Sequence, residues 1–151
     1  AIFYFYLISY FMHENFYHTV KDYYEDTDAG GIVYYANYLK YLERARTEAL
    51  ATIGLSNLQI KEKFGAFIIV KSCNIEFKKS AYLEDNLNIR SFIKSVTKTS
   101  FVMNQFISKD DNIIVEAQVH LVFVNDTSKP IKVPQIIFDN LKPYFCDSIK
   151  L

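Results

Sequence analysis

The stretch YYEDTDAGGIVYYANYLKYLERAR, residues 23–46, joins an acid-rich turn to a glycine pair and then to the start of an amphipathic helix. The turn carries Asp28, which is followed by Ala29 and the pair Gly30–Gly31. A carboxylate on a flexible turn just before a helix N-terminus places a base or a nucleophile beside free backbone N–H groups. Acyl-transfer chemistry needs such a pairing, because one group attacks or delivers water while N–H donors stabilise the oxygen that becomes negative. The alternative is a surface loop whose Asp residues cap the helix, since Asp and Gly dominate turns for conformational reasons.

The residues after this turn predict one long helix, Asn37–Ile53. Charged and polar residues occupy one side of it, and apolar residues recur at helical spacing on the other. These apolar positions are Tyr38, Leu42, Ala45, Ala49 and Ile53. Gly54 suits the position after the helix. The sequence SNLQ at residues 56–59 is a capping box, which predicts a second, short helix closed by Gly65.

From Ala66 onward the hydrophobic pattern changes to a period of two, which is typical of half-buried β-strands. Together with an N-terminal run that enters the acidic turn, the pattern predicts five strands: Phe16–Tyr24, Ala66–Lys79, Leu87–Val96, Ser100–Ser108 and Val115–Phe123. A short helix is expected at Pro134. One long helix with successive antiparallel strands is an α+β pattern, in which the long helix covers the apolar face of the sheet.

Length and composition fit one domain and exclude several functions. The chain has 151 residues, of which 17 are basic and 17 acidic, so it lacks the positive charge of a nucleic-acid-binding protein. Cys73 and Cys146 are isolated thiols, which favours a reducing compartment over a disulfide framework. His13, His18 and His120 lack the spacing of a metal site. The sequence contains no P-loop, GxSxG elbow or dinucleotide fingerprint, so we expect neither a metal nor an organic cofactor.

The first eleven residues, AIFYFYLISYF, are apolar and uncharged. They are fewer than the roughly 20 residues of a membrane-spanning helix, and they lack the basic region and cleavage site of a signal peptide. We expect Met12 to be the physiological start, so that residues 1–11 precede the native domain and residues 12–151 form it. An aromatic membrane anchor is the alternative for this segment. We accordingly expect a cytoplasmic protein, with peripheral binding to the inner membrane as the alternative.

The string YYEDTDAGGIVY, residues 23–34, closely resembles the signature of the hotdog-fold acyl-CoA thioesterases of the 4-hydroxybenzoyl-CoA thioesterase family. The resemblance is greatest to the Tol–Pal-cluster, or YbgC-type, branch. Ile75–Phe77 and Leu83–Asp85 resemble the family's second strand and the acidic turn after it, and Thr99–Val102 resembles the next strand start. The resemblance covers residues 16–138. It implies a hotdog fold, in which an antiparallel sheet wraps around one long central helix, and hydrolysis of acyl-CoA to a free acid and CoA.

The resemblance also assigns roles within the motif. Asp28 matches the family's catalytic carboxylate, which acts as a nucleophile through a mixed anhydride or as a general base on water. The family holds the thioester oxygen with a backbone N–H at the helix start, and the matching donor is the N–H of Tyr35. Gly30 and Gly31 are expected to let the backbone approach the substrate. Tyr24 matches a family Tyr near the carboxylate, for which substrate positioning and core packing both remain open.

Position 35 departs from part of the family, because many YbgC-type members carry His where this chain has Tyr35. A tyrosine hydroxyl is a poor base at neutral pH. We therefore expect Asp28 to do the chemistry without an imidazole. Asp26 is expected to cap the turn, although its charge would raise the proton affinity of Asp28 if the two carboxylates came close.

Coenzyme A carries phosphates, which basic side chains and free N–H groups bind. Lys98, two residues before Ser100, lies where the family has basic residues that contact the nucleotide end of the substrate. Lys98 and Ser100 therefore belong to the expected substrate-binding set. Lys78, Lys79 and Arg90 are further candidates.

Three functions are compatible with these features. The leading one is hydrolysis of an acyl-CoA or of an acyl carrier protein thioester. A hotdog dehydratase or hydratase is the second, and the lack of a His close to Asp28 in the sequence counts against it. The third is a non-catalytic acyl-binding or scaffold protein linked to phospholipid synthesis or the cell envelope, against which the complete Asp–Gly–Gly motif argues.

The strands predict an assembly of at least two copies. In the fourth predicted strand, apolar residues lie on both faces, with Phe101, Met103 and Ile107 on one and Val102 and Phe106 on the other. A single helix covers only one face, so a monomer would expose a sizeable apolar patch. Hotdog relatives pair edge strands and often dimerise again, so the resemblance implies a homodimer or homotetramer with the active site at the subunit boundary.

Overall fold

Five strands form one antiparallel sheet in the order β1–β3–β4–β5–β2, and the computed structural model describes residues 13–146 of the chain. The elements are β1 (Phe16–Lys21), η1 (Tyr24–Asp26), α2 (Asn37–Thr52), α3 (Asn57–Phe64), β2 (Phe67–Phe77), β3 (Asn86–Val96), β4 (Ser100–Lys109), β5 (Asn112–Val124), α4 (Gln135–Leu141) and η2 (Lys142–Tyr144). The prediction that residues 1–11 precede the domain lies outside the described residues. Within the described part, no helix has the length and apolar character needed to cross a membrane.

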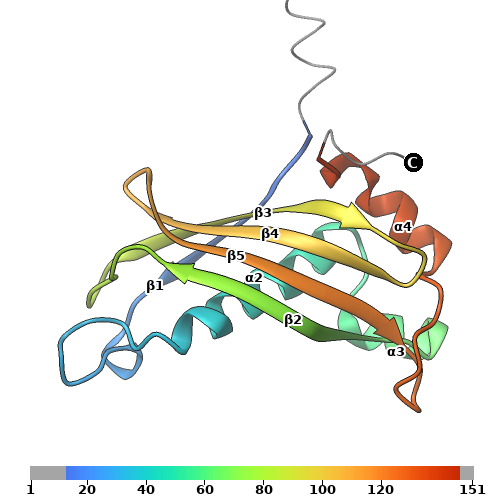
Figure 1. Ribbon diagram of the computed structural model, residues 1–151, viewed down its shortest axis with the longest axis horizontal. Coiled ribbons are helices and arrows are strands. Elements are labelled where there is room, and N and C mark those ends of the chain that lie inside the picture. The colour runs from blue at the N-terminus through green and yellow to red at the C-terminus, as the bar shows by residue number, and fades with distance from the viewer. Residues whose placement is uncertain (1–12, 147–151) are drawn as a thin grey trace, which may run out of the picture.

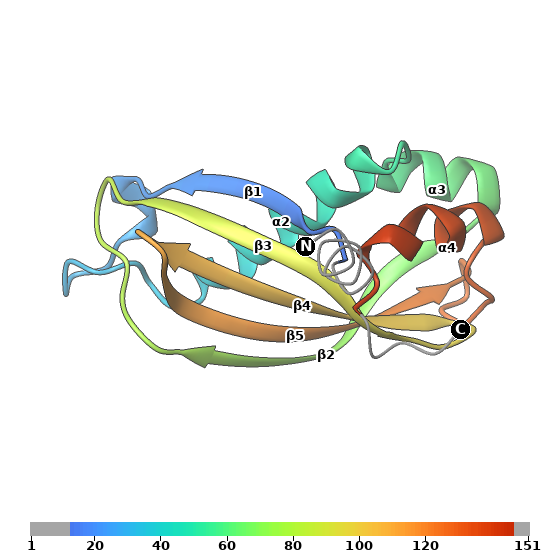
Figure 2. The same ribbon diagram turned by 90° about the horizontal axis from the view of Figure 1, so that it is seen from above.

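Helix α2 lies along one face of the sheet, while α3 and α4 lie at one end of it (Figures 1 and 2). This arrangement confirms the predicted α+β hotdog fold, with a sheet around one long helix. The helix buries one stripe of side chains: Asn37, Tyr38, Tyr41, Leu42, Ala45, Ala49 and Leu50. Of the predicted apolar face, only Ile53 falls outside the stripe, because it follows the last helical residue and is half-buried.

Alternate residues of the central strand β4 face opposite sides of the sheet. The side that faces α2 is buried and consists of Phe101, Met103, Gln105 and Ile107. Val102 and Phe106 face the other side and are half-buried, as predicted. The long helix therefore covers only the inner face, and apolar side chains remain on the outer face of a single chain.

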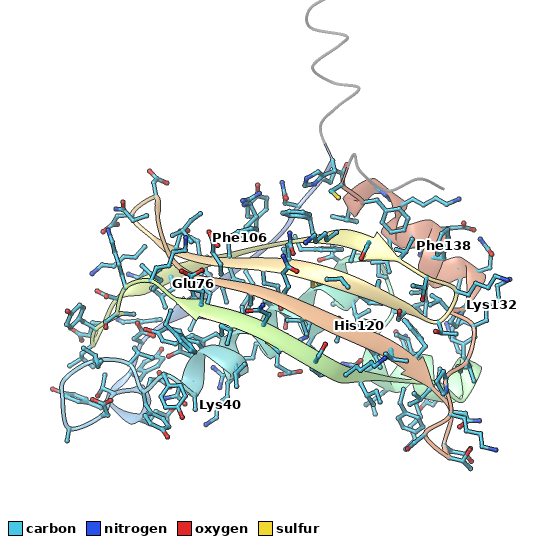
Figure 3. The ribbon with its side chains drawn as sticks, in the orientation of Figure 1. Lys40, Glu76, Phe106, His120, Lys132 and Phe138 are labelled. Atoms are coloured by element: carbon cyan, nitrogen blue, oxygen red, sulfur yellow. The ribbon has the colours of Figure 1, made fainter. Side chains whose placement is uncertain are left out.

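The outer face of the sheet carries a mixture of apolar, charged and polar side chains. Figure 3 shows Glu76, Phe106 and His120 along this sheet. Arg90, one of the candidates for a phosphate contact, lies against Phe92 and Phe106, with its guanidinium carbon 5.6 and 4.8 Å from the two ring centroids. Arg90 therefore belongs to the face opposite α2.

The starts of α2 and α3 differ in a way that bears on function. Helix α3 begins with the predicted capping box, in which the Ser56 hydroxyl accepts the N–H of Gln59 at 3.1 Å and the Gln59 side chain accepts the N–H of Ser56 at 2.9 Å. Gly65 follows its last residue at a φ of 58°, a left-handed conformation that favours glycine. Helix α2 begins after Ala36 without a side-chain cap. The N–H groups of Asn37, Tyr38 and Leu39 donate to the carbonyls of Tyr34, Tyr35 and Ala36 at 2.9, 3.3 and 3.3 Å. The N–H of Tyr35, just before the helix, has no acceptor among residues 13–146.

Strand β1 is shorter than predicted, because its pairing with β3 ends at Lys21, opposite Asn86. The following residues form a turn instead. The Asp26 carboxylate accepts the N–H of Tyr23 at 2.9 Å, and the N–H of Asp26 donates to the carbonyl of Tyr23 at 3.0 Å. These local bonds replace ladder bonds, so the predicted extension of the strand to Tyr24 is wrong.

Candidate active site

A tight loop between η1 and α2 presents Asp28. The N–H of Asp28 donates to the carbonyl of Ile32 at 2.9 Å, and the N–H of Gly31 donates to the carbonyl of Asp28 at 3.0 Å. Gly31 has a φ of 79°, which side chains with a Cβ rarely adopt. The N–H of Gly30 donates to Oδ1 of Asp28 at 2.8 Å, and a Cβ on Gly30 would lie only 3.1 Å from that oxygen. The loop thus favours glycine at both positions, for two different reasons.

Asp26 ties the start of this loop to the start of α2. Its carbonyl accepts the N–H of Tyr34 at 2.9 Å and the side-chain amide of the buried Asn37 at 2.8 Å. Its carboxylate meanwhile caps the preceding turn, as predicted. Because Asp26 and Asn37 flank the Asp28 loop on both sides, these bonds hold Asp28 close to the first turn of α2.

Asp28 and Tyr35 line the same surface pocket, which has a volume of ≈ 290 Å³. Asp28 is exposed, and Tyr35 is 60% exposed. The N–H of Tyr35 has no hydrogen-bond acceptor among residues 13–146. The remaining lining residues are Ile32, Val33, Tyr38, Phe77, Lys78, Lys79 and Ser80. Asp28 and Tyr35, to which the family resemblance assigns one reaction, therefore line one pocket.

The wall of this pocket opposite the loop is the segment that follows β2. The predicted strand runs to Lys79, but the observed pairing with β5 ends at Phe77. The chain turns there because the N–H groups of Lys78 and Lys79 both donate to the carbonyl of Ile114, at 2.8 and 3.2 Å. This turn brings both lysines to the Asp28 pocket, and Lys78 also forms an ion pair with Glu116 at 3.2 Å.

The other predicted site residues lie elsewhere in the chain. Tyr24 is 82% exposed and does not line the Asp28 pocket. Lys98 belongs to the turn between β3 and β4, and Ser100 is the first residue of β4. This turn lies at the opposite end of the sheet from the Asp28 loop (Figure 1). Ser100 is buried, and its hydroxyl lies 2.7 Å from that of Thr97. Within one chain these residues do not meet Asp28, and their roles stay predictions.

A second cavity of ≈ 150 Å³ lies between the middle of α2 and the inner face of the sheet. Its walls are largely apolar and include Leu50, Ile68, Val70, Phe101, Met103 and Leu121. Arg46 also lines it, and Nη1 of Arg46 donates to Oε1 of the buried Gln105 at 2.9 Å. Burial lowers the pKa of Arg46. The cavity thus has one polar side within an apolar lining.

Sequence reasoning missed a buried acid that precedes the Asp28 loop. Asp22 is fully buried, and its Oδ1 accepts the hydroxyl of Tyr41 at 2.7 Å. Burial raises the pKa of Asp22 to about 6, although the hydrogen bond from Tyr41 acts in the opposite direction. One signal was present in the sequence: Asp22 continues the inward-facing phase of β1, two residues after Val20.

Fold and site together define the class of protein, a hotdog-fold thioesterase. The chain belongs to the thioesterase-like superfamily, whose sequence profile matches residues 24–141. It is 39% identical over 125 residues to the acyl-CoA thioester hydrolase YbgC of Escherichia coli O157:H7, which covers 82% of this chain and 92% of that protein. It is 33% identical over 127 residues to the acyl-CoA thioesterase YbgC of Haemophilus influenzae, with 82% and 93% covered. The resemblance to the YbgC-type branch is confirmed.

Solved structures agree with this assignment. A probable thioesterase from Bartonella henselae is 28% identical, with a TM-score of 0.76, and the match covers 82% of this chain and all of that one (100%). A mutant 4-hydroxybenzoyl-CoA thioesterase in complex with 4-hydroxybenzoyl-CoA has a TM-score of 0.80 at 24% identity, with 84% and 98% covered. At that identity the second likeness concerns the fold alone.

Proposed function

We propose that this protein hydrolyses acyl-CoA thioesters to a free carboxylic acid and CoA, with Asp28 as the catalytic carboxylate. The observation that carries the proposal is the pocket that Asp28 and Tyr35 both line. Asp28 is exposed, and the N–H of Tyr35 has no acceptor among the described residues. The two YbgC relatives, an acyl-CoA thioester hydrolase and an acyl-CoA thioesterase, support the same reaction here. The residues that line the pocket include no histidine, which counts against a hotdog dehydratase or hydratase.

Asp28 can act in two ways. As a nucleophile, its carboxylate attacks the thioester carbonyl carbon, the C–S bond breaks, the CoA sulfur leaves and takes up a proton, and water then hydrolyses the mixed anhydride. As a general base, it takes a proton from a water molecule whose oxygen attacks the same carbon; the C–S bond then breaks, and the CoA sulfur leaves and takes up a proton. The hydrogen bond from Gly30 holds Oδ1, so Oδ2 is the reacting atom in either scheme.

The N–H of Tyr35 stabilises the charge that develops in both schemes. The carbonyl oxygen of the thioester becomes negative as the carbon becomes tetrahedral, and the N–H of Tyr35 donates to it. The positive end of the α2 dipole acts on the same oxygen. Loss of one such donor typically lowers the rate roughly a hundred- to a thousandfold. The tyrosine hydroxyl has no part in this step.

Lys79 is the proposed contact for a phosphate of CoA. It lines the pocket together with Lys78, but Lys78 already pairs with Glu116. Lys79 forms no ion pair within residues 13–146, so its ammonium group is available to an anion. An acyl carrier protein would present a phosphate as well, so it remains the alternative donor of the acyl group.

A homodimer formed through β2 would complete the site. Strand β2 is an edge strand, and its residues Ile69, Val70 and Phe77 are 43%, 49% and 43% exposed. An unpaired apolar edge is a template for another strand. In a two-fold antiparallel pair, the first half of one β2 lies opposite the second half of the other. The cavity beside Val70 would then adjoin the Asp28 pocket of the partner subunit.

This arrangement assigns the cavity under α2 to the acyl group. Its volume of ≈ 150 Å³ and its apolar lining suit a short hydrocarbon chain, and the Asp28 pocket of the partner subunit would hold the thioester. The turn with Lys98 and Ser100 would likewise approach the partner rather than its own Asp28. Half-buried apolar side chains on the outer face, such as Phe106, offer a second interface for a tetramer.

A panel of acyl-CoA substrates with a thiol-detecting reagent tests the proposal. The wild-type protein should release free CoA from at least one substrate, and Asp28→Asn should reduce release by several orders of magnitude. Asp126→Asn, an exposed turn acid at the far end of β5, serves as the matched control and should behave like the wild type. Wild-type turnover by Asp28→Asn would refute the role of Asp28. Absence of release from every acyl-CoA would refute the reaction, and a monomer mass by light scattering would refute the dimer.

A further inference from the structure

A buried carboxylate lies six residues before the catalytic one. Asp22 has no exposed surface, and its Oδ1 accepts the Tyr41 hydroxyl at 2.7 Å. Its Oδ2 is also buried and has no hydrogen-bond partner among the described residues. An ionised carboxylate with one unpaired oxygen is costly to bury, so these surroundings favour the protonated acid.

Tyr41 connects Asp22 to the part of α2 that lines the active site. It lies one helical turn after Tyr38, and the two rings meet edge to face with centroids 6.0 Å apart. The Tyr38 hydroxyl accepts the N–H of Ala81 at 3.0 Å, and Tyr38 also lines the Asp28 pocket. A displacement of Tyr41 therefore reaches the pocket through Tyr38.

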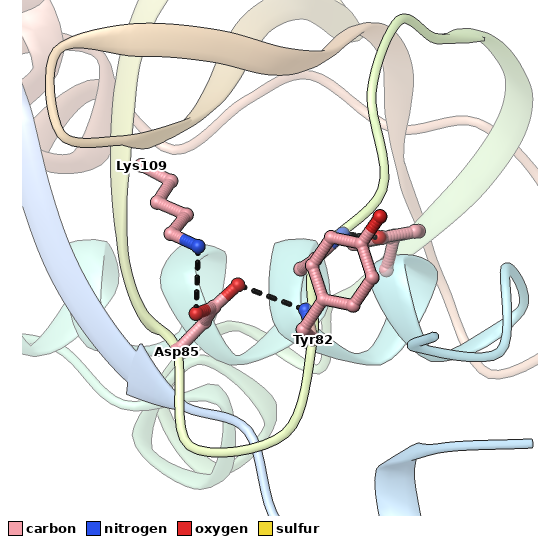
Figure 4. Close-up of polar contacts among 5 residues, drawn as sticks. Tyr82, Asp85 and Lys109 are labelled. Atoms are coloured by element: carbon pink, nitrogen blue, oxygen red, sulfur yellow. Dashed lines mark hydrogen bonds and ion pairs between the residues drawn. The ribbon is translucent and has the colours of Figure 1, made fainter. Parts of the chain in front are cut away.

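The backbone of Asp22 contacts the segment before β3, which continues from the pocket wall. The N–H of Asp22 donates to the carbonyl of Asp85 at 2.9 Å, and its carbonyl accepts the N–H of Glu84 at 2.9 Å. The Asp85 carboxylate in turn pairs with Lys109 at 2.8 Å and accepts the N–H of Tyr82 at 2.8 Å (Figure 4). Asp22 thus lies where β1, α2 and the connection between β2 and β3 meet.

The charges around Asp22 are mainly negative. The titratable groups that act on it or lie against it are Tyr38 and Tyr41 of α2, Asp26 of η1, Asp85 before β3 and Lys109 of β4. The pKa of Asp22 is raised to about 6, mainly by burial and also by the negative charges of Asp26 and Asp85. The Tyr41 hydrogen bond and Lys109 lower this pKa, but Lys109 already pairs with Asp85. Burial also raises the pKa of Tyr41, so its hydroxyl keeps its proton and remains the donor.

We propose that Asp22 is a positioning residue for the thioesterase reaction. It holds the Asp28 loop in position through Tyr41 and η1, and it does so best when its carboxyl group is protonated. The inference rests on the proposed function of Asp28. Loss of the proton adds a third negative charge beside Asp26 and Asp85. Repulsion then displaces η1, in which the Asp28 loop begins, and so moves Asp28 away from the N–H of Tyr35. Catalytic geometry is sensitive to such shifts.

The predicted consequence is a dependence of kcat on pH that is caused by the protonation of Asp22. In the wild type, kcat should fall roughly tenfold as pH rises through the pKa of about 6. The KM should change less, because Lys79 and the acyl cavity are not displaced. Asp22→Asn stays neutral and keeps a carbonyl oxygen for Tyr41, so its kcat should remain flat over the same interval. Tyr41→Phe removes the tether, and its kcat should be about tenfold lower at every pH.

The experiment measures kcat and KM against pH for these variants on one acyl-CoA. The ratio of wild type to Asp22→Asn is the decisive quantity, because pH effects that do not involve Asp22 are the same in both proteins and cancel. Melting temperatures at the same pH values distinguish this positioning role from a purely structural role of Asp22. A purely structural role would change the melting temperature and leave the kcat ratio constant. A constant ratio overturns the inference even if Asp28→Asn is inactive. If Asp28→Asn is fully active, the proposed function fails instead.

Discussion

Asp22 and Asp28 are the same residue type, six positions apart, in opposite surroundings. Asp22 is fully buried against Tyr41, and burial raises its pKa to about 6. Asp28 is exposed in a pocket, where a backbone N–H of Gly30 holds one of its oxygens. The proposed catalytic role of Asp28 rests on its access to water and to a pocket, and Asp22 has no such access. The side chain itself does not decide between the two roles.

Asp28→Asn tests the proposed catalytic role of Asp28 and should have the largest effect on the rate of hydrolysis. The amide oxygen can still accept the N–H of Gly30, so the loop keeps its shape, but the negative charge is lost. We expect hydrolysis to fall by more than about a thousandfold. The free energy of unfolding should change by less than about 0.5 kcal/mol, as is usual for exposed positions. Initial rates and urea titrations measure the two quantities, and a large loss of stability would show that Asp28 also supports the fold.

Asp22→Asn tests the raised pKa of the buried Asp22 through the pH dependence of the free energy of unfolding. The pKa of Asp22 rises from 3.8 to about 6 on folding, so the folded state favours the protonated form. The wild-type free energy of unfolding should therefore fall as pH rises from 3.8 to about 6 and then level off. The neutral variant should lack this fall, which amounts to at most about 3 kcal/mol at about 1.4 kcal/mol per pKa unit. Urea unfolding at a series of pH values measures it, and parallel curves for the two proteins would contradict the pKa assignment.

Gly30→Ala tests how closely the backbone must approach Asp28. The new Cβ would lie 3.1 Å from Oδ1, so the carboxylate must move by a few tenths of an ångström. We expect kcat to fall about tenfold with little change in melting temperature. Gly31→Ala is the matched control, because its Cβ would meet nothing within 4 Å but the residue has a φ of +79°. It should lower stability by about 1 kcal/mol. Equal losses of activity and stability in the two variants would contradict the hypothesis that Gly30 is required mainly for the position of the Asp28 carboxylate.

Tyr35→Phe should have the smallest effect of the series. The proposed contribution of Tyr35 is its backbone N–H, which the substitution leaves in place. We expect kcat to stay within about threefold of the wild type, and Tyr35→His should also be tolerated. Steady-state kinetics on the same substrate measures this. An effect as large as that of Asp28→Asn would mean that the hydroxyl takes part, and Asp28 would then not act alone.

Much of the fold was predictable because it depends on local patterns. The Ser56 capping box and Gly65 confirm the short helix, and the alternation of Phe101 and Val102 along β4 confirms the strand and its two faces. These features involve neighbours in sequence, whose spacing identifies them. The ends of β1 and β2 were predicted too long, because local hydrogen bonds at Asp26 and Lys78 end the pairing earlier than the apolar pattern does.

The site likewise has features that were predictable from local sequence and features that were not. Asp28, Gly30, Gly31 and the N–H of Tyr35 lie within eight residues, so the motif alone determined that a carboxylate and a helix start would be close. Tertiary structure decided what surrounds them. It brought Lys78 and Lys79 to the pocket, moved Lys98 and Ser100 to the other end of the sheet, and buried Asp22 against Tyr41. The positions of these residues and the burial of Asp22 depend on where each strand ends and on which helix packs against it. A local pattern of residue types does not determine burial or the distance between segments remote in sequence.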